Sequence, residues 1–82
     1  MQILTVDARL NDNLLYGTAA STRGVVYRWG SDMRGRLIWA DRQEPYPQME
    51  GYEFWRCLGQ SRAPAALRKA VKAIASNKRK AG

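Results

Sequence analysis

The sequence predicts an α+β domain, in which a small antiparallel β-meander of four to five strands packs one amphipathic C-terminal helix on one face. Three observations predict this class. Apolar and polar residues alternate in several short segments before residue 58. Turn-forming glycine, asparagine and aspartate residues separate those segments. The segment 63–76 instead repeats its apolar residues at the spacing of a helix.

The N-terminal part predicts two strands joined by a turn. Residues 2–8 alternate as a strand, with Leu4 and Val6 on the same face. The Asn-Asp-Asn run at 11–13 predicts a turn, because these side chains bond their own backbone and tolerate positive φ. For 14–20 we prefer a strand with a bulge at its glycine. A short helix capped by the aspartate of the turn is the alternative.

The segment 25–29 is the clearest strand of the chain. A core this small needs its largest side chains. The residues expected to face the helix are therefore Val25, Tyr27 and Trp29. Arg28 and the loop arginines Arg23 and Arg34 would then project from the open face of the sheet.

The second half of the sheet is predicted from two further strands. A loop with glycine at both ends leads into 36–41, where Leu37 and Trp39 would share one face. Two prolines predict an irregular link over 42–50, because proline disrupts both helices and central strands. Residues 51–58 alternate again and predict the last strand.

The segment 63–76 predicts the helix. Its apolar stripe at i, i+3, i+4 and i+7 consists of Leu67, Ala70, Val71 and Ile74. Six alanines favour the helical state, and Pro64 suits a first turn. Ser61 is the expected N-cap. Ser76–Asn77 is the expected end of the helix.

Positive charge is concentrated at the C-terminal end of the chain. Residues 62–82 hold seven of the fourteen basic residues and no acid, whereas 1–61 hold seven arginines and all seven acids. The net charge of +7 therefore lies in the last segment. Each phosphate that a basic side chain neutralises releases a counterion, so such a segment favours polyanions. The side chains predicted to contact phosphates there are Arg68, Lys69, Lys72, Lys78, Arg79 and Lys80. A solvated helix face is the alternative.

Eighty-two residues predict one domain, 1–76, followed by a basic, frayed tail at 77–82. A core of this size supplies about 3–5 kcal/mol, so a homodimer is an open alternative. The single cysteine, Cys57, excludes an intrachain disulfide and is expected to pack as a small buried hydrophobe. It also favours a reducing compartment. With no signal peptide or membrane-spanning run recognised, we expect a cytoplasmic protein that does not contact a membrane.

The sequence contains none of the residue patterns that would identify a catalytic site. The absence of histidine excludes Ser-His-Asp triads, Cys-His dyads and the usual zinc sites. Neither a P-loop nor a dinucleotide-binding glycine motif occurs. The spacing of the acids follows no pattern that would bring them together around Mg²⁺; these acids are Asp32, Asp41, Glu44, Glu50 and Glu53. A metal-free ribonuclease using arginine, lysine and Tyr27 lacks an identifiable base. We therefore expect a non-enzymatic protein without cofactor or metal.

Arginines and aromatic residues interleave around the central hairpin. The arginines that would add phosphate contacts are Arg23, Arg28, Arg34 and Arg36. Alternating guanidinium and aromatic planes on a strand surface are typical of proteins that stack on unpaired bases. The expected stacking residues or partner anchors are Trp39, Tyr46 and Trp55. Burial of the tryptophans in the core is the alternative.

The leading hypothesis is a small nucleic-acid-binding protein that contacts backbone phosphates and has no strong sequence readout. The nucleic acid itself is not predicted. The alternative is an interaction or inhibitor module that docks on an acidic protein or a nucleoprotein complex. Small phage-encoded inhibitors of host or defence machinery are often single domains of this size, an analogy of size alone.

Overall fold

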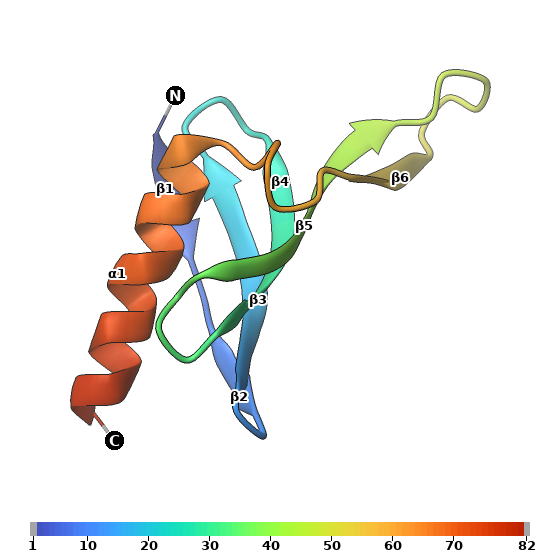
Figure 1. Cartoon of the computed structure of the whole chain (residues 1–82). Helices are drawn as coiled ribbons and strands as arrows, with labels where there is room; N and C mark the ends of the chain where they lie inside the picture. The colour runs from blue at the N-terminus through green and yellow to red at the C-terminus, as the bar shows by residue number, and fades with distance from the viewer. Residues whose placement is uncertain (1, 82) are drawn as a thin grey trace.

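Figure 1 shows the computed structural model of the chain, which describes residues 2–81. One C-terminal helix packs against one face of a six-stranded antiparallel sheet, which confirms the predicted α+β meander. The elements are β1 (Ile3–Val6), β2 (Arg9–Asn11), β3 (Leu14–Ser21), β4 (Val26–Asp32), β5 (Leu37–Pro45), β6 (Glu53–Cys57) and α1 (Ala65–Ala81). Within the described residues, no helix is long and apolar enough to cross a membrane.

The strand order is β1-β3-β4-β5-β6, and β2 continues the β1 edge by pairing with β3. Asp7 bridges the gap between the two short strands. Its N–H donates to the Thr18 carbonyl at 3.1 Å, and its Oδ1 accepts from the Thr18 N–H at 2.8 Å. A side chain at Gly17 would overlap the backbone of Asp7. Gly17 therefore permits this close approach and, contrary to the prediction, sits in regular register opposite Trp29.

The core lies between the sheet and α1. Its buried residues are Leu15, Ala19, Tyr27, Trp29, Ala40, Leu58, Ala63, Leu67, Val71 and Ala75. Tyr27 and Trp29 are buried as predicted, and Val25 packs partly buried against them. Trp29 can be completely buried because its indole N–H donates to the Thr18 carbonyl at 3.2 Å.

A bulge in β5 corrects the predicted faces of that strand. Gly30 pairs with Trp39 while Ser31 pairs with Leu37, so Ile38 is the extra residue. Leu37 packs against the core, but Trp39 turns to the open face and remains 39% exposed. The prediction that these two residues share a face is wrong, as is the placement of Gly30 in the loop rather than in β4.

A second irregularity lies in β1. The pairing register shifts between Ile3 and Thr5, which breaks the two-residue alternation. As a result Ile3 and Val6 both pack against the core, and Leu4 is 70% exposed. The prediction that Leu4 and Val6 share a face is therefore wrong.

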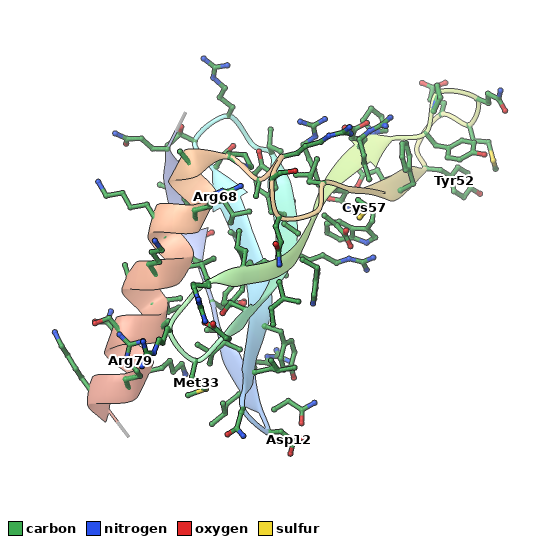
Figure 2. All side chains as sticks on the ribbon, viewed as in Figure 1. Asp12, Met33, Tyr52, Cys57, Arg68 and Arg79 are labelled. Atoms are coloured by element: carbon green, nitrogen blue, oxygen red, sulfur yellow. The ribbon has the colours of Figure 1, made fainter. Side chains whose placement is uncertain are left out.

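The distal parts of β5 and β6 form a hairpin that projects from the body (Figure 1). β4 pairs with β5 only as far as Arg42, so the rest of the hairpin extends beyond the sheet and the molecule measures 44 × 24 × 21 Å. The predicted irregular link over 42–50 is wrong at its start, because residues 42–45 belong to β5 with Pro45 at its last position, whereas 46–50 form the turn of the hairpin. Cys57 on β6 is exposed, which corrects its predicted burial (Figure 2).

The helix begins later and ends later than predicted. It starts at Ala65, and the Pro64 carbonyl accepts from the Arg68 N–H at 3.1 Å, so Ser61 lies too far upstream to cap it. It then continues through Ser76 and Asn77 to Ala81. Alanine, lysine and arginine favour this state, and the cations lie at the negative end of the helix dipole. Residues 77–81 are thus helical, while Gly82 lies outside the described residues.

Candidate nucleic-acid interface

The helix presents a line of basic side chains next to its buried stripe. Arg68, Lys72 and Arg79 follow at i, i+4 and i+11, a spacing that returns to one flank of a helix. This flank faces the loop between β4 and β5. The Arg79 guanidinium donates to the Met33 carbonyl at 3.0 Å. Both residues are labelled in Figure 2, at the end of the helix that lies beside this loop. The loop and the basic flank of α1 are therefore in direct contact.

A hollow of about 230 Å³ lies between this loop and the helix. It is lined by Gly35, Arg36, Leu37, Gln60, Arg68 and Lys72. Arg34 and Arg79 line a second, more open hollow on the same side of the molecule. We call these five basic side chains the basic groove: Arg34, Arg36, Arg68, Lys72 and Arg79.

Asp32 holds the loop side of the groove in place. Its carboxylate accepts from the backbone N–H groups of Arg34 and Arg36 at 3.0 and 2.9 Å, and from Arg36 Nε at 2.8 Å. The backbone and side-chain hydrogen bonds from Arg36 hold the pKa of Asp32 below its ordinary value of 3.8. Asp32 therefore fixes the backbone of the loop that carries both arginines.

Two of the helix arginines are anchored on backbone carbonyls. Arg68 donates to the carbonyls of Ala63 (3.2 Å) and Gln60, and Arg79 donates to Met33. A guanidinium has five N–H donors, so each of these arginines keeps donors for an anion. Anchoring also fixes a long side chain before any ligand arrives, which lowers the entropy that binding would cost.

Most ion pairs of the described carboxylates lie outside the groove. Among the described side chains the ion pairs are Arg28–Asp41, Arg36–Asp32, Arg42–Glu44 and Arg56–Glu44. Hydrogen bonds from Arg56 and Arg42 lower the pKa of Glu44 below 4.5, so this carboxylate is committed to its partners. No basic residue of α1 takes part in these pairs. Of the five basic groups of the groove, one therefore has a carboxylate partner within the described side chains.

The structure brings together five of the ten predicted phosphate contacts. Lys69, Lys78 and Lys80 are exposed on α1 outside the groove. Arg23 lies on the β3–β4 turn, at the opposite end of β4 from the groove. Arg28 is on the open face, paired with Asp41. The prediction that Arg34 projects from the open face is wrong, because it lies beside Arg79 on the helix side.

The predicted aromatic anchors divide between two places. Trp39 and Trp55 lie on the open face, where the Arg28 guanidinium sits 4.6 Å from the centre of a Trp55 ring. Tyr46 lies on the projecting hairpin and packs edge-to-face on Phe54 at 5.9 Å. Gln60 in the groove was missed by sequence reasoning, since an isolated glutamine in a connection carries no signal.

Among the described residues no three His, Cys, Asp or Glu side chains gather in a way that could hold a metal ion. The groove instead offers guanidinium, ammonium and amide groups, whose chemistry is the binding of anions. No protein-family model matches the chain, and neither a curated protein nor a solved structure is significantly similar to it.

Proposed function

We propose that the protein is a non-enzymatic nucleic-acid-binding module that holds backbone phosphates in the basic groove. The observation that carries this proposal is the meeting of five basic side chains from α1 and the β4–β5 loop. Among the described carboxylates, Asp32 alone forms an ion pair with them. Guanidinium groups offer two parallel N–H donors to a phosphate, and Lys72 adds a point charge.

The expected binding is governed by salt rather than by base sequence. Each phosphate neutralised releases condensed counterions, so the logarithm of affinity falls by about 0.9 per contact for each tenfold rise in salt with duplex DNA. The groove is lined mainly by cations, which contact phosphates and carry no base information. We therefore expect steep salt dependence and weak sequence preference.

Arg34 and Lys72 are the residues to change first. Within the described part of the chain, neither side chain forms a hydrogen bond that holds the fold together, whereas Arg68 and Arg79 donate to backbone carbonyls. Arg34→Gln combined with Lys72→Gln should weaken binding to labelled DNA and RNA. It should also reduce the salt slope by about 1.8 with duplex DNA, at about 0.9 per lost contact. Fluorescence anisotropy across a salt series measures both quantities.

Arg23→Gln is the matched control, because it removes one positive charge from the opposite end of β4. It should leave the slope nearly unchanged. Equal slopes for the wild type and the double variant would exclude the groove as the phosphate site. Neutralising five of the six basic residues of α1 together should abolish a gel shift; the residues changed would be Lys69, Lys72, Lys78, Arg79 and Lys80.

A second candidate function is docking on another protein, and the projecting hairpin favours it. Its turn exposes three large apolar side chains to solvent, namely Tyr46, Met49 and Tyr52. Exposed aromatic residues clustered on one protrusion are typical interface anchors. A pull-down from extract, with and without nuclease, separates the two functions, because only a protein partner survives nuclease treatment. An inhibitor that blocks a nucleic-acid-processing complex would belong to this second function.

A further inference from the structure

The open face of the sheet carries an exposed tryptophan in an unusual setting. Trp39 pairs with Gly30 in β4, and its indole ring lies over the position that a side chain at Gly30 would occupy. The glycine thus makes room for the ring on the sheet. The bulge at Ile38 turns Trp39 to this side, away from the buried core. The chain therefore leaves a large aromatic ring outside a core that has few large side chains.

A tyrosine flanks the same glycine from the other side. Tyr16, Gly30 and Trp39 lie in one row across β3, β4 and β5, and the two aromatic residues are 40% and 39% exposed. Both rings line two hollows of the open face. The larger hollow, of about 270 Å³, also contacts Arg9 and Arg28. This row forms an aromatic platform, which we define as Tyr16, Gly30 and Trp39.

We propose that the aromatic platform stacks an unpaired nucleobase, with Trp39 as the main contact, so that the protein binds a single strand more tightly than a duplex. This inference depends on the proposed function, since the basic groove supplies the phosphate contacts. The faces of bases inside a duplex are already covered by their neighbours, whereas unpaired bases can stack on protein rings. Stacking tolerates any base because every base has a π-face.

The path from groove to platform is short. Leu37 lines the groove on the helix side of β5, and Trp39 is two residues further on the opposite face, about 7 Å along the strand. Within the described residues, β6 pairs with β5 only from Asp41 to Pro45, so no strand covers the outer edge at 37–39. A single strand that crosses this edge contacts phosphate-binding cations first and the platform next.

The polar groups around the platform favour a base over a charged partner. Arg28 is paired with Asp41, and the Asp7 carboxylate accepts from the N–H and the hydroxyl of Thr18. Arg9, which lines the same hollow, offsets the charge of Asp7, so the face is nearly neutral, as the bases are, while the excess charge lies in the groove. Phosphates and bases of one strand thus each meet a surface of matching chemistry.

The test compares the variant Trp39→Ala with the wild type on two labelled probes. One probe is an oligothymidylate of about 16 nucleotides, the upper end of the length that one small domain covers. The other is a DNA duplex with the same number of phosphates. We expect Trp39→Ala to bind the single strand about 5- to 150-fold more weakly, which corresponds to about 1–3 kcal/mol per stacked base. Duplex affinity should not change.

Leu4→Ala is the control, because Leu4 is an exposed apolar side chain on β1, lines neither hollow of the platform and has no π-face. It should bind both probes as the wild type does. Binding of the single strand should also quench tryptophan fluorescence, and this quenching should disappear in Trp39→Ala.

Each other outcome overturns the inference and shows at which level it fails. If Trp39→Ala binds the single strand as tightly as the wild type, while Arg34→Gln with Lys72→Gln weakens it, the groove survives and the platform is excluded. If the wild type binds neither probe, both proposals fail together. If it binds neither probe but retains a protein from nuclease-treated extract through Trp39, the platform is a protein-docking face.

Discussion

The contact between the β4–β5 loop and α1 can be tested at one glycine. Gly35 has a φ of +84°, and a Cβ placed there would lie 2.7 Å from Lys72 Cα and 3.1 Å from the Val71 carbonyl oxygen. Both neighbours are helix backbone, which cannot swing aside as a flexible side chain can. Gly35→Ala must therefore push the loop and the helix apart.

Gly51 supplies a control with the same backbone conformation. Its φ is also +84°, but an added Cβ would meet nothing within 4 Å. The left-handed conformation alone costs a non-glycine residue about 1–2 kcal/mol. Gly51→Ala should lose that amount from the free energy of unfolding. Gly35→Ala should lower the free energy of unfolding by about 1–3 kcal/mol more than Gly51→Ala does, which is the usual range for overpacking.

Urea unfolding followed by circular dichroism measures both losses. A domain of this size has about 3–5 kcal/mol to lose, so Gly35→Ala should approach complete unfolding while Gly51→Ala stays folded. Equal losses in the two variants would refute the reasoning, because they would show that the loop does not rest on the helix. The basic groove would then have no fixed wall.

Three further predictions concern acid, the core and the cysteine. The arginine hydrogen bonds that lower the pKa of Asp32 and Glu44 stabilise the fold fully above the ordinary values of 3.8 and 4.5, and this stability is lost as pH falls through the lowered values. The melting temperature should drop on acidification through that range, and less so in Asp32→Asn. Leu67→Ala should cost about 2–5 kcal/mol in thermal melts because Leu67 is completely buried, whereas Leu10→Ala on the surface should cost under about 0.5 kcal/mol. Cys57 should react with a thiol reagent in the native protein, and protection until unfolding would contradict its exposure.

The periodic parts of the fold could be predicted from the sequence. The stripe around Leu67 and Val71 identified α1, and the alternation of Tyr27 and Trp29 identified a strand facing it. Both predictions depend only on local spacing, and burial follows directly from the spacing once a helix has a sheet to cover.

The misses arise where one residue or one contact decides the outcome. The bulge at Ile38 reverses the face of Trp39, and no composition signal marks it. Proline predicts an end of regular structure, yet Pro45 takes the last position of β5, where its missing N–H costs little stability. Helix propensity carried α1 past Asn77, where a weak stop signal predicted an end.

The positive charge of the candidate site could be predicted from the sequence, but its position on the fold could not. The excess of basic residues in the C-terminal segment is evident from the chain alone. Which of them meet Arg34 and Arg36 depends on how the helix crosses the sheet, since only one flank of α1 reaches the β4–β5 loop. That crossing is set by packing between residues far apart in the sequence.

The projecting hairpin has a consequence for how the molecule opens. Its strands beyond Asp41 contribute no residue to the buried core and are held by their own ladder and by exposed arginine–carboxylate pairs. Local unfolding of such a segment costs less free energy than unfolding of the body, so its amide hydrogens should exchange with solvent well before those of β3 and β4. We therefore expect the hairpin to unfold independently of the rest of the domain. A partner that binds the hairpin would have to restrict this local unfolding.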